Sequence, residues 1–91
     1  MPEQKDDSFV KIGKKPVMSY VTASIRSLEK VKEITIQARG KNIARAVDAV
    51  EILKNQFKCT SGNIKIGTDE LKPEGSNQSI RISTIEIVVR K

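Results

Sequence analysis

Apolar and polar residues alternate in two short segments near the start of the chain, and apolar residues recur every three or four positions between them. Residues 8–12 and 34–39 alternate, which predicts two β-strands with one buried face. Apolar side chains at positions 17, 20, 21, 25 and 28 predict an amphipathic helix that runs to about Lys30. Pro16 is suited to the first position of that helix.

A second apolar stripe follows Gly40, which ends the second strand. Residues 43–57 keep one face apolar over about four turns, and this spacing predicts a second helix. Asn42 is expected to cap the N-terminus of that helix, because its side chain can accept a hydrogen bond from an unpaired backbone N–H group.

The last third of the chain alternates again between turn signals. Residues 60–63 contain the turn signal Ser-Gly-Asn, so we expect a third strand to open at Ile64. A polar segment follows, with an obvious turn at residues 73–77. Residues 80–90 are then predicted to form the last strand.

The apolar side chains of this last strand change phase part-way along it. Ile80 and Ile82 share one parity, whereas Ile85, Ile87 and Val89 share the other. Because a shift of one residue turns every side chain to the opposite face, we expect a bulge, a twist or a change of environment near residues 83–84. The last two strands are therefore expected to form a hairpin whose base belongs to the sheet and whose distal half leaves the body.

The order βαβαββ with short connections predicts a two-layer α/β (α+β) sandwich, with two helices on a mixed four-stranded sheet and a protruding hairpin. The first strand–helix–strand unit is expected to be right-handed, which makes its two strands parallel. A chain of 91 residues suffices for one domain and not for two, so residues 8–91 are expected to form a single domain after a flexible tail of residues 1–7.

The parallel strands bring both strand-to-helix loops, residues 13–16 and 39–42, to one edge of the sheet. Ligands of open α/β sheets favour this edge, and helix N-termini favour anions there. Polar loops with lysines are also common in proteins that bind no anion, but the convergence of two basic loops favours a surface for phosphate backbones. The cations of this edge are Lys14, Lys15, Arg39 and Lys41, with Arg45 one turn into the second helix.

The net charge and the lengths of the apolar segments limit the classes of binding partner. The chain has 17 lysines and arginines against 11 acids, and the net charge of +6 favours DNA, RNA or an anionic membrane surface. No segment reaches the roughly 18 apolar residues of a membrane span, and residues 1–7 lack the apolar core of a signal peptide. We therefore expect a cytoplasmic protein with no membrane partner. A domain this small is marginally stable, so self-association is expected to help.

The sequence contains few residues that could support catalysis or bind a metal ion. The chain has no histidine, and its single cysteine, Cys59, is expected to be a plain free thiol. Because no metal-ligand cluster, glycine-rich phosphate motif or activated nucleophile is present, we expect no enzyme, no cofactor, no metal and no small-molecule substrate. The acids Glu29, Glu33, Asp48 and Glu51 lie on expected helix surfaces or strand edges, where they are solvated partners for nearby lysines.

Four segments resemble the signature segments of one known family. They are Ile12-Gly13-Lys14-Lys15-Pro16-Val17-Met18, Ala38-Arg39-Gly40-Lys41, Ala46-Val47-Asp48 and Ser83-Thr84-Ile85-Glu86-Ile87. In order and spacing, over about residues 8–91, the chain resembles the Alba family of archaeal chromatin proteins. The resemblance implies the βαβαββ fold, a two-fold symmetric homodimer, and binding to double-stranded DNA and often to RNA. It also implies that the protein coats and compacts the chromosome.

The resemblance further implies roles for particular residues. Lys14 and Lys15 match the family's paired central lysines, and Lys14 is the one expected to be acetylated, which would remove a phosphate partner. Phe57 matches an apolar position that packs one dimer against the next along DNA; the alternative is that Phe57 is an ordinary core residue at the end of the second helix. The last hairpin matches the arms that reach along a groove. The full expected nucleic-acid-binding set is Lys14, Lys15, Arg39, Lys41, Asn42, Arg45, Lys72 and Arg81.

The hairpin departs from the family's pattern in its charge. Residues 68–79 contain Asp69, Glu70 and Glu74 against the single cation Lys72, whereas a groove-reaching arm usually profits from arginine and glycine. We therefore expect binding that is weaker or more selective than is typical of the family.

Two other functions remain open. An RNA-binding protein, such as a ribonucleoprotein component or an RNA chaperone, would use the same basic edge, because backbone contacts distinguish DNA from RNA poorly. With Phe9, Tyr20 and Phe57 as the only aromatic residues, stacking on single-stranded bases is disfavoured, so structured RNA would be the target. A pure interaction scaffold would bind polyanions independently of salt, or not at all.

Overall fold

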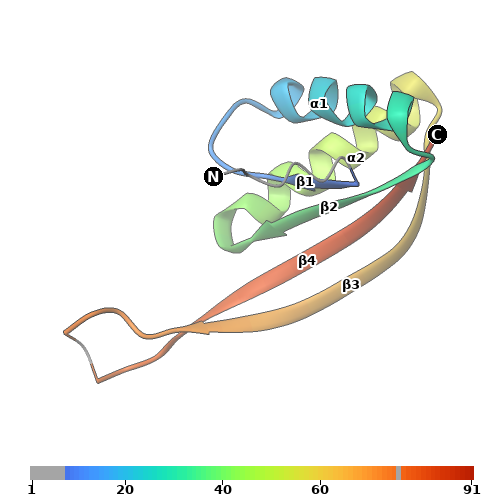
Figure 1. Cartoon of the computed structure of the whole chain (residues 1–91). Helices are drawn as coiled ribbons and strands as arrows, with labels where there is room; N and C mark the ends of the chain where they lie inside the picture. Colours follow the sequence, from blue (N-terminus) through green and yellow to red (C-terminus); the bar gives the residue numbers. More distant parts are fainter. Residues whose placement is uncertain (1–7, 76) are drawn as a thin grey trace.

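Two helices pack on one face of a four-stranded sheet in the computed structural model, which describes residues 8–75 and 77–91 (Figure 1). The expected flexible tail, residues 1–7, lies outside the described residues. Neither described helix is long and apolar enough to cross a membrane. The elements are β1 (Phe9–Lys11), α1 (Val17–Lys30), β2 (Glu33–Arg39), α2 (Ile43–Phe57), β3 (Thr60–Leu71) and β4 (Ile80–Arg90), with a short 3-10 helix (Gly40–Asn42) before α2. The predicted βαβαββ order and two-layer architecture are confirmed.

The sheet is mixed and has the strand order β1-β2-β4-β3. β1 and β2 are parallel, with Phe9 opposite Thr35 and Lys11 opposite Gln37, as expected for a strand–helix–strand unit. β4 lies between β2 and β3 and runs antiparallel to both. Both strand-to-helix loops therefore follow the carboxyl ends of the parallel pair, at one edge of the sheet, as the sequence predicted.

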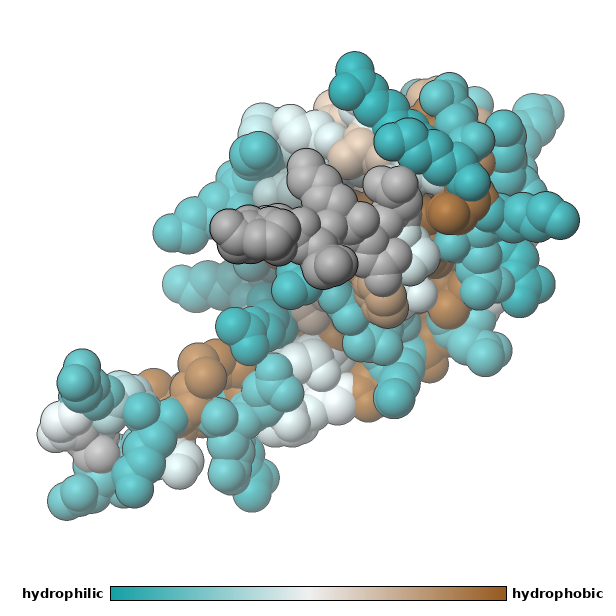
Figure 2. Space-filling model, in the orientation of Figure 1, coloured by the Kyte–Doolittle hydropathy of each residue, from teal (hydrophilic) through white to brown (hydrophobic). Residues whose placement is uncertain are grey.

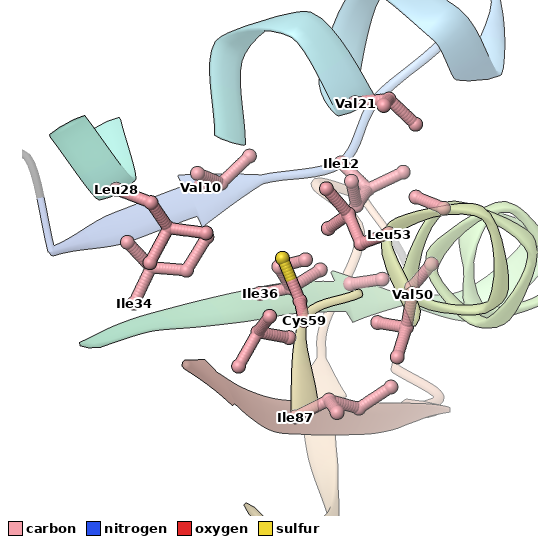
Figure 3. Packing of buried hydrophobic residues seen from close by; sticks show 14 residues of the cluster. Val10, Ile12, Val21, Leu28, Ile34, Ile36, Val50, Leu53, Cys59 and Ile87 are labelled. Atoms are coloured by element: carbon pink, nitrogen blue, oxygen red, sulfur yellow. The ribbon is translucent and has the colours of Figure 1, made fainter. Parts of the chain in front are cut away.

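The core forms where one face of the sheet meets one stripe of each helix. Burial along β2 alternates residue by residue, and Ile34 and Ile36 are fully buried on the helix side. Figure 3 shows side chains from both layers, among them Leu53 of α2, converging between the helices and the sheet. The buried cluster is Val10, Ile12, Val21, Leu28, Ile34, Ile36, Ala38, Ala46, Ala49, Val50, Leu53, Cys59, Ile87 and Val89.

Cys59 belongs to this core. It is a free thiol, as expected, and it is buried directly after Lys58, whose left-handed backbone (φ 59°) ends α2. Burial raises the pKa of the Cys59 thiol, and the positive charge of Lys91 opposes this rise to a smaller extent. A raised pKa keeps the thiol protonated and hence a poor nucleophile.

The turn predicted at residues 60–63 is wrong, because β3 already begins at Thr60. Its pairing with β4 passes from Ser61 opposite Val89 to Ile64 opposite Ile87. Two residues, 62 and 63, therefore face the single Val88, which is a β-bulge. Glycine suits this place, because a Cβ atom on Gly62 would lie 3.3 Å from a side-chain carbon of Val88. The turn signal marks a bulge inside a strand.

β4 changes its environment, and not its register, where its apolar side chains change phase. Its pairing with β3 is continuous from Ile80 to Ile87, so the bulge considered near residues 83–84 is absent from β4. Its pairing with β2 ends at Thr84, opposite Arg39. On the N-terminal side of Thr84, β4 has only β3 as a neighbour, and the two strands project from the body (Figure 1). We call this projecting part, residues 68–75 and 77–83, the arm.

Candidate nucleic-acid interface

Exposed cations gather where β1 and β2 end. Lys14 and Lys15 lie in the loop between β1 and α1, and Lys41 lies in the 3-10 helix between β2 and α2; all three are exposed. The first turns of α1 and α2 contain no acidic residue. The positive ends of two helix dipoles therefore stand beside these lysines without a nearby carboxylate in those turns to neutralise them.

The first of these loops is held by Tyr20, one turn into α1. The hydroxyl oxygen of Tyr20 accepts hydrogen bonds from the backbone N–H groups of Gly13 (2.8 Å) and Lys15 (3.0 Å). A Cβ atom on Gly13 would lie 3.1 Å from the same oxygen, so the absence of a side chain lets the loop approach it. Lys14 and Lys15 are thus presented by a backbone that is tied to the helix they precede. Pro16 stands just before α1, one position earlier than predicted.

Arg45 joins the two loops. Its Nη1 atom donates to the backbone carbonyl oxygen of Gly13 (3.3 Å) and to Oδ1 of Asn42 (2.9 Å). Asn42 occupies the N-cap position of α2, as expected, but its backbone is helical and its side chain makes no capping hydrogen bond. Instead its oxygen orients Arg45, whose guanidinium bridges from α2 to the loop after β1. The cation expected to bind phosphate therefore also fastens one basic loop to the other.

The second loop turns sharply at Gly40. This residue has a left-handed backbone (φ 61°), which glycine adopts without steric penalty. A Cβ atom there would lie 3.4 Å from a methyl carbon of Ile82, at the base of the arm where it joins the body. The second basic loop therefore lies against the arm. We call the edge formed by the two basic loops, residues 13–16 and 39–42, the loop edge; it forms one continuous surface with the arm.

The remaining predicted cations lie along the arm or at its junction with the body. Lys72 and Arg81 are exposed residues of the arm, and Arg39 is at the end of β2. Arg39 is 3.2 Å from a carboxylate oxygen of Asp69, and Arg81 is 3.9 Å from one of Glu70. The structure thus brings Lys14, Lys15, Lys41 and Arg45 to one edge and leaves Lys72 and Arg81 outside that cluster.

Sequence reasoning missed two residues of this region. Tyr20 fitted the apolar stripe of α1, and no sequence signal showed that its hydroxyl would meet a loop seven residues earlier. The sequence shows Asp69 only as part of an acidic segment, because its contact with Arg39 joins residues thirty positions apart.

Comparison with known proteins agrees with this geometry. Residues 8–68 match the family model described as Alba. Among solved structures, Alba from Thermoplasma volcanium shares 35% sequence identity with a TM-score of 0.81, over 91% of this chain and 99% of that chain. ALBA1 from Trypanosoma brucei shares 27% identity with a TM-score of 0.79, over 97% of this chain and 72% of that chain.

The fold and the loop edge define a small α+β domain with a basic surface of the kind that suits polyanions. With more than half of its residues matched by the family model, the chain belongs to the Alba family, whose members bind nucleic acids, both DNA and RNA.

Replacing Tyr20 with phenylalanine should loosen the first loop and leave the fold intact. The ring stays, but the Gly13 and Lys15 N–H groups lose their acceptor. We expect both amides to exchange with solvent about fivefold faster, as the loss of one hydrogen bond of about 1 kcal/mol implies. The Cys59 amide, bonded to the Leu53 carbonyl oxygen at the other end of α2, serves as an internal control. Unchanged exchange at Gly13 and Lys15 would contradict this role of Tyr20.

Proposed function

We propose that this protein is a non-enzymatic chromatin protein of the cytoplasm that binds duplex DNA as a homodimer, through the phosphate backbone, and coats or compacts the chromosome. We propose that it binds RNA as well. The observation that carries this proposal is the single edge made by two basic loops. Arg45 bridges these loops through the Gly13 carbonyl oxygen, so Lys14, Lys15 and Lys41 are held as one group.

The composition of the edge supports backbone contacts over base recognition. Loop residues 13–16 and 40–42 contain no aromatic side chain, so they offer no surface on which a base could stack. Exposed lysines attract phosphates as flexible point charges and impose no sequence preference. Structured RNA can meet the same edge, so competition between DNA and RNA duplexes of equal length measures which polymer is preferred.

The arm supports a contact away from the loop edge. The molecule is 46 Å along its longest axis against 31 and 23 Å along the others, and the arm projects from its body (Figure 1). A two-stranded ribbon is narrow enough to enter a DNA groove. Lys72 and Arg81 are the exposed cations that the arm would bring to the duplex.

An apolar surface beside α2 supports the homodimer. Ile64 and Ile66 of β3 are 60% and 76% exposed, although they stand opposite Ile87 and Ile85, on the helix side of the sheet. Val47 of α2 is also exposed. Ile52 lies on the flank of α2 that faces α1, because it borders a hollow that Val17 of α1 also lines. Val47 lies about 140° around the helix from Ile52 and so occupies the flank of α2 away from α1. Two copies that cover these residues would bury apolar surface that one copy leaves in water.

We also propose that Phe57 packs one dimer against the next along DNA and that Lys14 is a site of acetylation. Phe57 ends α2 and is 45% exposed, outside the buried cluster, so its ring is available to a neighbouring dimer on DNA. Lys14 is exposed, so its ammonium group is accessible to acetylation. Loss of that charge would weaken phosphate binding at the centre of the loop edge.

Replacing Lys14 and Lys15 together with glutamine should weaken binding to any duplex sequence and leave the melting temperature unchanged. Each phosphate contact contributes about 0.9 to the slope of log affinity against log salt, and a symmetric dimer loses every contact twice. Binding titrations across a salt series measure this slope. The control is the double replacement of Lys30 and Lys32 with glutamine, at the opposite end of α1. A slope that is the same in both variants would remove the main support for the site.

The protein should sediment as a dimer at micromolar concentration without DNA. Replacing Ile64 and Ile66 with lysine should produce monomers, because charges would enter the proposed apolar interface. Replacing Met18 and Thr22 with lysine, on the exposed side of α1, is the matched control and should leave the dimer intact. A well-folded monomer in the unsubstituted protein would count against the homodimer.

Replacing Phe57 with alanine should change binding to long DNA more than it changes stability. Because Phe57 is half exposed, we expect a small fall in melting temperature, whereas Leu53→Ala, one turn earlier and fully buried, should cost about 2–5 kcal/mol. The steepness of binding to a long duplex should decrease in Phe57→Ala. A large fall in melting temperature with unchanged steepness would assign Phe57 to the core.

A further inference from the structure

At the junction between the body and the arm, Arg39, one of the proposed binding cations, is already engaged in an ion pair. Arg39 is the last residue of β2, and Asp69 is among the first residues of the arm. Nη1 of Arg39 donates to Oδ2 of Asp69 at 3.2 Å. Because Ile34, Ile36 and Ala38 face the helices, Arg39 projects from the opposite face of the sheet, on which neither described helix packs.

The strand register explains how these distant residues meet. Arg39 stands opposite Thr84 on β4, and Thr84 stands opposite Gly67 on β3. Asp69 is the next residue of β3 on the same face as Gly67. Gly67 has no side chain to block the path from Arg39 to Asp69, and a Cβ atom there would lie 3.1 Å from Oγ1 of Thr84. Arg39 therefore reaches across β4 to the arm.

The pair is accessible to water and therefore exchangeable. The side chains of Arg39 and Asp69 are 57% and 51% exposed. Ion pairs as exposed as this contribute little to folding stability, because water and salt screen them. They border a hollow of about 340 Å³ on the sheet, also lined by Lys11, Gln37 and Glu86. A phosphate that approaches Arg39 must displace Asp69 or remain beside its negative charge.

From these contacts we propose that Asp69 attenuates nucleic-acid binding by competing with phosphate for Arg39. This inference rests on the proposed function and assigns its regulation to one carboxylate at the base of the arm. In the free protein, Asp69 neutralises Arg39. When DNA binds, a phosphate replaces Asp69 as the partner of the Arg39 guanidinium, and the phosphate releases one counterion. The freed Asp69 carboxylate then attracts one cation from solution, so the net release of counterions is smaller. Asp69 thereby lowers both the affinity and its salt dependence.

Arg81 and Glu70 form a second pair of the same kind on the arm. Their charged atoms are 3.9 Å apart, and their side chains are 80% and 63% exposed, so this contact is longer and more hydrated than that of Arg39. We therefore assign the stronger competition to Asp69.

The test is Asp69→Asn, which removes the charge and preserves the shape of the side chain. We expect the affinity for duplex DNA to rise about fivefold for each substituted protomer of the dimer. Removal of one water-screened charge about 4 Å from a bound phosphate implies this factor. The salt slope should become steeper by about 0.9 for each chain. The control Glu74→Gln removes the same charge from the turn of the arm, and we expect a change below about twofold. Thermal melting should be the same for all three proteins.

A second comparison isolates the ion pair from net charge. In an Arg39→Gln background, Asp69→Asn should gain no more affinity than Glu74→Gln does. Equal gains from Asp69→Asn and Glu74→Gln in the unsubstituted background, or no gain from either, would overturn the inference. The proposed function would survive that result if Lys14→Gln with Lys15→Gln still flattens the salt slope. If the unsubstituted protein and Asp69→Asn both fail to bind duplex DNA at any salt concentration, the proposed function fails, and this inference fails with it.

Discussion

Parallel pairing of β1 and β2 is the constraint on which the rest of the structure depends. With Phe9 opposite Thr35 and Lys11 opposite Gln37, both strands end at the same edge of the sheet. Each must then pass through a loop into a helix that returns over the same face, so two helix N-termini and two basic loops are placed side by side. The same pairing buries Val10 and Ile36 beneath the helices, so the core and the binding edge have one origin.

Proximity alone does not give a defined surface, because loops are usually mobile. Here the backbone N–H groups of Gly13 and Lys15 bind the hydroxyl oxygen of Tyr20, and the carbonyl oxygen of Gly13 accepts a bond from Arg45. These contacts tie the first loop to both helices. Lysines on an ordered backbone lose less conformational entropy when they meet phosphates, while their exposed ends still adapt to any sequence.

The sequence could predict features that depend on local pattern. The alternation of Ile34, Ile36 and Ala38 predicted a strand, and the apolar stripe of residues 43–57 predicted a helix. The right-handedness of strand–helix–strand units then predicted the parallel pair and, with it, the cluster of basic loops. Two local predictions failed, one of them in part, because other contacts replaced the expected ones. The side chain of Asn42 bonds Arg45 and does not cap α2. The Ser-Gly-Asn segment became a bulge because β4 pairs with both sides of it.

The contacts of Tyr20 and Asp69 lay beyond sequence reasoning for a related physical reason. A hydroxyl meets a loop, or an arginine meets a carboxylate on another strand, only in one register and one packing of the whole sheet. The contact between Arg39 and Asp69 depends on the pairing of three strands and on the missing side chain of Gly67. The charge of the arm was visible in the sequence, but the cation that this charge would neutralise was not.

A titration of ¹⁵N-labelled protein with a short DNA duplex, followed by amide chemical shifts, tests most directly whether the two basic loops form one nucleic-acid-binding surface. The largest changes should fall on residues 13–15 and 40–41, with further changes along the arm. Amides at the opposite edge, where α1 ends, such as that of Val31, should be unaffected apart from any change in oligomeric state. Changes that concentrate at that opposite edge and spare both basic loops would contradict the claim that these loops form one nucleic-acid-binding surface.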